Sequence, residues 1–257
     1  MIIRKLLISN RGEIASRIIR SAHDMGISCV AIYTEADTNT PYVREADQAF
    51  KLSDTYLNAK EILEIAKKND VDAIHPGYGF LSENANFANS VKKAGIKWVG
   101  PSANAIKKMG DKLTAKTLAE KVGVPTLPMG TSSKDAKNIG YPILVKAAAG
   151  GGGKGMRIVD DAKDLKESIA SAEREAEGGF GDKRVFLERY IERSRHIEVQ
   201  ILGDSYGNLV HLGERECSIQ RRHQKIIEES PSPMVSDSMR REMGAAALKL
   251  ASKLKYE

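Results

Sequence analysis

The 257-residue chain has only two cysteines, Cys29 and Cys217, and they lie far apart in the sequence. Two distant cysteines form neither a disulfide framework nor a zinc-site spacing, so we expect reduced thiols in a cytoplasmic protein. The chain also lacks long apolar runs, since no window approaches the roughly 20 residues of a membrane helix. The apolar N-terminal run stops at Ser9, before Asn10-Arg11-Gly12-Glu13, so we expect neither a signal peptide nor a membrane partner.

Aromatic residues make up only 5% of the chain, although its net charge of +6 is of the sign found in nucleic-acid-binding proteins. The densest basic run is Gln-Arg-Arg-His-Gln-Lys, residues 220–225. Read alone, it indicates a nucleic-acid or localisation patch. Four nearby carboxylates would repel a phosphate backbone, namely those of Glu214, Glu216, Glu228 and Glu229. We therefore expect no nucleic-acid partner, and interpret the run as lining for a small anionic substrate.

Two common nucleotide-binding motifs are absent. The glycine run Gly150–Gly153 is followed by Lys154 and Gly155, whereas a P-loop needs serine or threonine after its lysine. A dinucleotide-binding turn opens a helix, but Met156–Val159 has the pattern of a strand. The loop Asn10–Glu13 also lacks the glycine spacing of that turn, which argues against NAD.

The glycine run nevertheless follows a short apolar segment, Ile143-Leu144-Val145, which has the length of a buried strand and ends in Lys146. Consecutive glycines let backbone N–H groups approach a ligand closely, and cupped N–H groups suit phosphate oxygens. Two flanking lysines add positive charge. The pattern predicts a hairpin flap that closes over phosphates, with a flexible linker as the alternative.

The hydrophobic fraction of 41% and charged fraction of 29% are those of a globular protein of one large or two ordinary domains. Strands and helices alternate over the first hundred residues. We predict strands at 2–9, 27–33, 71–75 and 97–99, and helices at 13–24, 59–68 and 85–94. This βαβ pattern predicts a doubly wound parallel sheet over about residues 1–103, with ligands at the carboxyl ends of its strands.

After this domain the pattern changes to mixed α+β. A helical connector is divided at Gly110-Asp111, where Asp111 is a candidate N-cap. Lys112 then lies in a first helical turn, where an anion is favoured, although a solvated lysine is the alternative. We also predict a helix at 162–177, a turn at 178–181, strands at 185–188, 196–201 and 209–212, and a C-terminal helix that includes 255–257.

The strand 196–201 alternates polar and apolar residues, so His196, Glu198 and Gln200 share one face. The alternative to a binding role is that this polar face of the strand is simply exposed to solvent. Ile197, Val199 and Ile201 are expected on the opposite face.

Taken together, the chain resembles biotin carboxylase, the ATP-grasp component of biotin-dependent carboxylases. Five motifs carry the resemblance in order along the whole chain, at residues 10–15, 75–84, 109–112, 141–157 and 216–225. The resemblance implies an N-terminal α/β domain (1–103), a connector (104–128), an ATP-grasp lid (129–190) and an incomplete C-terminal ATP-grasp subdomain (191–257).

The implied reaction uses ATP and bicarbonate to carboxylate biotin through carboxyphosphate. The implied partners are a biotin carboxyl carrier protein or domain, a second copy of the chain, and a carboxyltransferase subunit. Acetyl-CoA, propionyl-CoA and pyruvate all stay open as acceptors. The alternative is an inactive nucleotide-binding or interaction module.

The resemblance also implies roles for individual residues. Phosphates would be held by Lys112 and Lys146 under a flap containing Gly152 and Gly153. Adenine would be held, largely through backbone groups, at a hinge formed by Glu188, Arg189, Tyr190 and Ile191, with His196 and His223 also near the nucleotide. Lys225 is the predicted catalytic residue, facing bicarbonate. The ligands of Mg²⁺ are expected beyond this sequence, so we predict no metal ligand here, and no activity of the chain alone.

Overall fold

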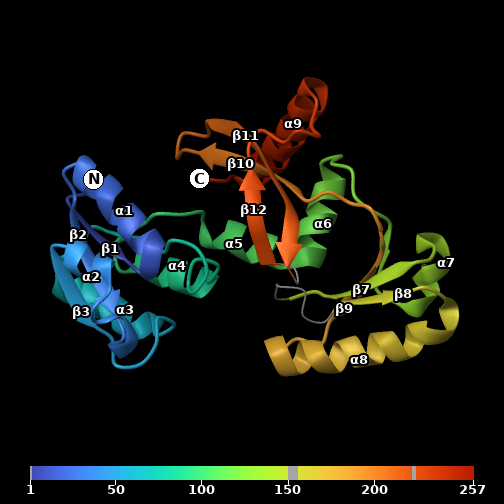
Figure 1. Cartoon of the computed structure of the whole chain (residues 1–257), viewed down its shortest axis with the longest axis horizontal. Helices are drawn as coiled ribbons and strands as arrows, with labels where there is room; N and C mark the ends of the chain where they lie inside the picture. Colours follow the sequence, from blue (N-terminus) through green and yellow to red (C-terminus); the bar gives the residue numbers. More distant parts are fainter. Residues whose placement is uncertain (1, 150–155, 222–223) are drawn as a thin grey trace. The chain divides into compact units, whose positions relative to one another are not determined.

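The structure is a computed structural model that describes residues 2–149, 156–221 and 224–257. The chain forms two compact units, Met1–Lys107 and Lys108–Glu257. Both units are drawn in Figure 1. The finer division of residues 104–257 into connector, lid and C-terminal subdomain stays a prediction.

The N-terminal unit is built on a five-stranded sheet of order β3-β2-β1-β4-β5, in which every paired strand is parallel. The strands are β1 (Lys5–Ile8), β2 (Ser28–Tyr33), β3 (Gln48–Lys51), β4 (Ala73–His75) and β5 (Lys97–Trp98). The helices are α1 (Gly12–Asp24), the 3₁₀ turn η1 (Glu35–Asp37), α2 (Pro41–Glu45), α3 (Ala59–Lys68), α4 (Ala85–Lys93) and α5 (Ala103–Gly110). The predicted α/β class is confirmed.

Three elements of this unit were not predicted, the 3₁₀ turn η1, the short helix α2 and the edge strand β3. Strand β3 has only two apolar residues, Ala49 and Phe50, and both are half-buried. A four-residue strand with so little alternation has no periodicity of its own, and its pairing with β2 therefore comes from tertiary contacts.

Both faces of the sheet are covered. Leu7 points into one apolar core, which contains residues of α3 and α4. Leu6 and Ile8 point into a second core, which contains residues of α1. Near-continuous apolar strands are what a parallel sheet buried on both sides requires.

Two loops at the carboxyl ends of β1 and β4 are tied together by one side chain. The Asn10 amide, 2% exposed, donates hydrogen bonds of 2.7 Å to the carbonyl oxygens of Pro76 and Tyr78. Gly77 lies between these two acceptors with a φ of +64°, and a Cβ placed there would lie 2.7 Å from Asn10 Nδ2. The loop therefore needs glycine at this position both for its backbone conformation and for space.

We expect Gly77→Ala to lower the free energy of unfolding of the N-terminal unit by about 3 kcal/mol. The left-handed backbone contributes roughly 1–2 kcal/mol and the displaced Asn10 amide the rest. Gly79→Ala is the matched control, because Gly79 has a φ of +66° with no neighbour within 4 Å and should lose only the backbone part. Urea unfolding followed by the fluorescence of Trp98, the single tryptophan, measures both. Equal losses in the two variants would contradict the role of Asn10.

The C-terminal unit begins with α6 (Lys112–Lys121) and contains a four-stranded antiparallel sheet of order β6-β9-β7-β8. Its strands are β6 (Met129–Gly130), β7 (Ile143–Ala147), β8 (Arg157–Val159) and β9 (Val185–Arg189). Its helices are η2 (Ser133–Asp135), α7 (Ala136–Ile139) and α8 (Ala162–Phe180). The predicted hairpin of β7 and β8 is confirmed.

Helix α8 covers one face of this four-stranded sheet (Figure 1). Ile143, Val145 and Leu187 point into the core that α8 closes. Lys146 and Glu188 belong to the alternate positions of β7 and β9, so they lie on the opposite face. That face is therefore free to carry polar side chains.

The predicted turn at residues 178–181 is wrong for its first three residues, because α8 continues to Phe180. Glycine in a helix costs only about 1 kcal/mol relative to alanine, which buried Ala172 and Ala176 offset on the same helix. The helix ends at Gly181, whose φ of +68° gives the left-handed C-terminal cap. The N-cap assigned to Asp111 is confirmed, because its side chain accepts a hydrogen bond of 2.8 Å from the backbone of Thr114.

The remainder of the unit is a three-stranded antiparallel sheet of β10 (Ile197–Gly203), β11 (Leu209–Arg221) and β12 (Gln224–Glu229), followed by helix α9 (Asp237–Leu254). Strand β11 is longer than predicted, and the described residues of the basic run, 220–221 and 224–225, lie in β11 and β12 and pair with each other. The helix predicted to include residues 255–257 stops at Leu254, because Lys255 has a φ of 51°. None of the helices in the described parts of the chain is long and apolar enough to cross a membrane.

Candidate functional site

A cleft with a volume of about 620 Å³ lies in the C-terminal unit. It is lined from the four-stranded sheet, from the segment after β9 and from the β10–β11 hairpin. The lining residues are Leu144, Lys146, Met156, Tyr190, Ile191, Glu192, Ser194, Arg195, His196, Ile197, Ser218 and Gln220. This volume and this mixture of apolar and cationic side chains are typical of a site for an anionic small molecule.

One wall of the cleft carries Lys146, and its ammonium is held by a carboxylate. Lys146 Nζ lies 2.5 Å from Glu188 Oε2, and Lys116 Nζ lies 2.5 Å from Glu188 Oε1. Burial disfavours the charged form of Glu188, but hydrogen bonds from Lys116 and Lys146 outweigh it, and the pKa of Glu188 lies below its usual value. Glu188 is therefore ionised at neutral pH.

Lys112 lies at the first position of α6 and approaches the same strand. Its Nζ donates a hydrogen bond of 3.0 Å to the carbonyl oxygen of Ala147, the neighbour of Lys146. Burial and the charge of Lys146 lower the pKa of Lys112. Two ammonium groups that destabilise each other favour an anion between them. The structure thus brings together the two lysines predicted to hold phosphate.

Of the four predicted hinge residues, two line the cleft, and the other two, Glu188 and Arg189, do not. Tyr190 and Ile191 follow β9 and line the cleft. Arg189 is still part of β9, one residue beyond the predicted strand end, and its guanidinium donates a 2.5 Å hydrogen bond to the carbonyl oxygen of Tyr141. Arg189 is thus engaged in holding the chain before β7 and does not line the cleft.

His196 lines the cleft from the residue before β10. Gln220 Nε2 is 2.8 Å from His196 Nδ1, and since an amide nitrogen only donates, Nδ1 accepts there. The backbone N–H of His196 donates a 2.8 Å hydrogen bond to Ser218 Oγ. These contacts fix the ring at the edge of the cleft and leave Nε2 as its donor.

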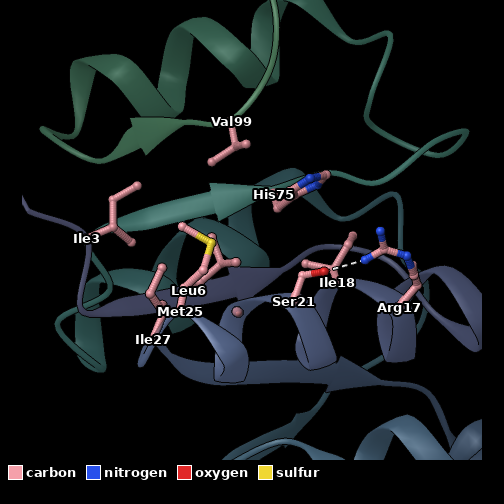
Figure 2. A pocket seen from close by; sticks show the side chains of 10 residues that line it. Ile3, Leu6, Arg17, Ile18, Ser21, Met25, Ile27, His75 and Val99 are labelled. Atoms are coloured by element: carbon pink, nitrogen blue, oxygen red, sulfur yellow. Dashed lines mark hydrogen bonds between the residues drawn. The ribbon is translucent and has the colours of Figure 1, made fainter.

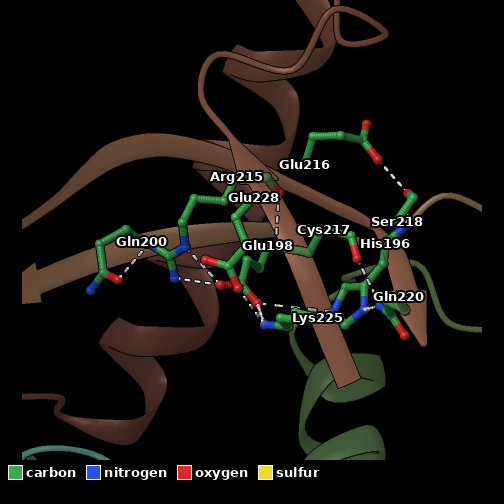
Figure 3. Close-up of polar contacts among 10 residues, drawn as sticks. All are labelled: His196, Glu198, Gln200, Arg215, Glu216, Cys217, Ser218, Gln220, Lys225 and Glu228. Atoms are coloured by element: carbon green, nitrogen blue, oxygen red, sulfur yellow. Dashed lines mark hydrogen bonds and ion pairs between the residues drawn. The ribbon is translucent and has the colours of Figure 1, made fainter. Parts of the chain in front are cut away.

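Lys225 lies beside the cleft in a cluster of charges on β10, β11 and β12 (Figure 3). Its ammonium contacts Glu198, which also accepts a 2.7 Å hydrogen bond from Arg215 Nε. Arg215 reaches Gln200 as well, which supports the prediction that His196, Glu198 and Gln200 share one face. The hydrogen bond to Glu198 raises the pKa of Lys225, so the side chain is a cation at neutral pH.

Three predicted site residues, Gly152, Gly153 and His223, lie outside the described residues. Sequence reasoning missed several residues of the site, among them Lys116, Arg195 and Gln220. Gln220 lies in the motif at residues 216–225, so the resemblance could have indicated it as a site residue. Lys116 has the spacing i, i+4 from Lys112 and so shares its helical face, but lysines at that spacing are common on solvated helices.

A second cleft, of about 360 Å³, lies in the N-terminal unit between α1 and the strands (Figure 2). Its walls are almost entirely apolar, with Leu6, Ile18 and Met25 among them. Arg17, one of its few polar residues, donates a hydrogen bond to Ser21. One arginine already engaged on its own helix does not make a polyphosphate site, so the cleft in the C-terminal unit is the better candidate.

Two groups among the described residues bring three possible metal ligands within 4.8 Å of one another, namely His23, Cys29 and Asp47, and Glu198, Cys217 and Glu228. Burial raises the pKa of Cys29 to about 11, so its thiol is protonated. Glu198 already contacts Lys225 and Arg215. Beside Lys146, both oxygens of Glu188 contact ammonium groups. These carboxylates do not fit a magnesium site, which needs oxygen ligands free of such pairing.

The chain matches two family descriptions, one after the other. Residues 2–106 match "Biotin carboxylase, N-terminal domain", and residues 111–257 match "Carbamoyl-phosphate synthase L chain, ATP binding domain".

Relatives with described activities cover nearly the whole chain. Biotin carboxylase 1 of Bacillus subtilis is 48% identical over 267 residues, which span 99% of this chain and 59% of that protein. One of the subunits of pyruvate carboxylase from Methanothermobacter thermautotrophicus is 48% identical over 98% of this chain and 54% of its own length. The chain therefore spans a little over half the length of these relatives.

Solved structures agree with these matches. Biotin carboxylase of Campylobacter jejuni, in complex with a β,γ-ATP ligand, has a TM-score of 0.96 and 45% identity over all of this chain and 60% of that one. The biotin carboxylase domain dimer of Hydrogenobacter thermophilus 2-oxoglutarate carboxylase, in complex with MgADP, ADP and bicarbonate, has a TM-score of 0.95 and 43% identity, over all of this chain and 59% of that one. The parallel sheet, the antiparallel ATP-grasp sheets and these matches together show that the chain belongs to the biotin carboxylase family.

Proposed function

We propose that this chain provides the ATP-binding part of a biotin carboxylase, with ATP in the 620 Å³ cleft and its phosphates toward Lys112 and Lys146. One observation carries the proposal. Lys146, Tyr190, Ile191 and His196 are separated by up to 50 residues in sequence, yet they line one cleft, as the resemblance predicts. Tyr190 and Ile191 would hold adenine, and His196 would lie near the sugar.

In the proposed reaction, the terminal phosphoryl group of ATP passes to an oxygen of bicarbonate, giving ADP and carboxyphosphate. Carboxyphosphate then breaks its bond between carbon and the bridging oxygen to give phosphate and carbon dioxide. The ureido nitrogen of biotin attacks carbon dioxide, and its proton passes to the phosphate ion that the breakdown has just released. The lysines would neutralise charge on the phosphates, which is the main protein contribution to phosphoryl transfer.

Lys225 is the candidate for bicarbonate. Its pKa is raised by the hydrogen bond to Glu198, so it stays protonated at neutral pH. A permanently charged ammonium binds and orients an anion but does not remove a proton from it. We therefore assign Lys225 to holding bicarbonate, and not to acting as its base.

The proposed partners are a biotin carboxyl carrier protein or domain, a second copy of the chain, and a carboxyltransferase subunit. Support comes from relatives described as subunits of pyruvate and methylcrotonoyl-CoA carboxylases, and from the dimer of the Hydrogenobacter domain. Phosphoryl transfer also needs a metal to bridge the phosphates. The carboxylates near the described lysines do not fit a magnesium site. We therefore expect residues 1–257 alone to bind ATP but to show no bicarbonate-dependent turnover.

Calorimetric titration of ATP and of adenosine into the chain tests this function. We expect saturable ATP binding with a Kd below about 1 mM, in the range of ordinary substrate affinities, and weaker binding of adenosine because it has no phosphates. A parallel assay with bicarbonate should release no phosphate. Absence of ATP binding, or equal affinity for adenosine, would contradict the proposed role of the lysines.

A further inference from the structure

Lys116 is a partly buried lysine that is not among the residues lining the cleft. Its side chain is 10% exposed, that of Glu188 is 13% exposed, and that of Lys146 is 25% exposed. Each oxygen of the Glu188 carboxylate contacts a different ammonium, at 2.5 Å in both cases. An ammonium so little exposed needs a polar partner in place of water, and the Glu188 carboxylate is that partner.

The backbone explains why these three groups meet. Lys112 and Lys116 are four residues apart on α6, so both side chains leave the same face of the helix. Glu188 pairs directly with Leu144 across β9 and β7, and Lys146 is two residues further along β7. Glu188 and Lys146 are therefore diagonal neighbours on the sheet face that lies away from α8, within reach of each other.

The formal charges of Lys116, Lys146 and Glu188 indicate a role for Lys116. If Glu188 had Lys146 as its single partner, the pair would be formally neutral, and Lys146 would bring no net charge to the cleft. With Lys116 as second partner, two formal positive charges face one formal negative charge, and the three groups together have a formal net charge of +1. The positive member that lines the cleft is Lys146.

We propose that Lys116 is a positioning residue for nucleotide binding, which shares the Glu188 carboxylate and so keeps the charge of Lys146 available to phosphate. The inference rests on the proposed function of the cleft, because it concerns the same phosphate end. Lys116 acts through Glu188 and has no contact with the nucleotide.

The test compares Kd values for ATP and adenosine in a set of variants of the whole chain. Lys116→Met keeps the apolar stem and removes the charge, so ATP affinity should fall fivefold or more while adenosine affinity stays within twofold. Lys116→Arg should restore ATP affinity. Lys121→Met is the matched control, because it makes the same charge change at an exposed position of the same helix and should change nothing.

The double variant Lys116→Met/Glu188→Gln separates charge from packing. Without the carboxylate, Lys146 has no competitor for its charge, so ATP affinity should return to within about twofold of the starting chain. A lysine that acts only by packing predicts no such recovery. Unchanged ATP affinity in Lys116→Met, an equal loss for adenosine, or no recovery in the double variant would each overturn the inference.

A measurement without nucleotide keeps this result distinct from the proposed function. The pKa of Glu188, followed by ¹³C NMR in the free protein, should rise in Lys116→Met, because one of its two ammonium partners is gone. If the pKa rises but the starting chain binds no ATP, the proposed function is wrong, whereas the sharing of the Glu188 carboxylate by Lys116 and Lys146 is supported. If ATP binds and the pKa does not respond to Lys116→Met, the inference fails.

Discussion

Replacing Lys146 with glutamine should weaken ATP binding to this chain tenfold or more. The ammonium lines the cleft, and a hydrogen bond to a charged group contributes about 1.5–3 kcal/mol, which is one to two powers of ten in affinity. The loss should exceed that of Lys116→Met, because Lys146 itself faces the ligand. Calorimetric titration measures the change.

Lys166→Gln is the control for this experiment. Lys166 is exposed on α8, which covers the other face of the four-stranded sheet, so its loss changes the net charge equally without touching the cleft. Adenosine affinity should stay nearly constant in both variants. An equal loss of ATP affinity in Lys146→Gln and Lys166→Gln would mean that net charge, and not a phosphate contact, governs binding.

The second large effect concerns the docking of α9 on β11. Glu214 is 3% exposed and receives two 2.8 Å hydrogen bonds from Arg240, from Nε and Nη2, as well as one of 3.1 Å from the backbone of Ser232. Arg240→Met would leave this carboxylate buried with one backbone donor. Breaking a buried ion pair costs about 3–5 kcal/mol, and we expect about 3 because Arg240 is partly exposed.

Hydrogen exchange of the α9 amides is the appropriate measurement, since it reports the stability of this segment alone. A loss of about 3 kcal/mol corresponds to exchange that is roughly a hundredfold faster. Arg241→Met, at the neighbouring exposed position, should exchange as the starting chain does. Similar rates in all three proteins would show that the pair does not hold α9.

The same pair should give α9 a pH dependence of known sign. The hydrogen bonds from Arg240 lower the pKa of Glu214 from 4.5 to about 2. A carboxyl whose pKa is depressed on folding contributes stability above its unfolded pKa and loses it as the pH falls toward the folded pKa. Protection of α9 should therefore fall between about pH 4.5 and 2, and this part of the fall should be smaller in Arg240→Met.

The N-terminal domain could be predicted from sequence because its signals are local. The apolar runs around Leu7, Val30 and Ile74 are buried strands, and helices α1, α3 and α4 each have one apolar face. Strand β3 was not predicted, because its position is set by pairing with β2 and not by a pattern in its own sequence.

The same contrast between local sequence signals and long-range contacts applies to the candidate site. Lys146 was predicted because a strand, a lysine and a glycine run are contiguous in sequence. Lys116 was missed because its role depends on Glu188, which is 72 residues away and reaches it only through the packing of α6 on the sheet. Arg189 stays a predicted hinge residue, because that role depends largely on backbone groups, and the contact of its guanidinium with the carbonyl of Tyr141 has no sequence signature.

The most direct test of ATP binding in this cleft is hydrogen exchange of the whole chain with and without saturating ATP. We expect ATP to slow exchange at the cleft segments, residues 143–147, 190–197 and 218–220, and to leave residues 5–98 unchanged. Slower exchange at the strand ends of the N-terminal unit without change at residues 190–197, or no change anywhere, would contradict ATP binding in this cleft.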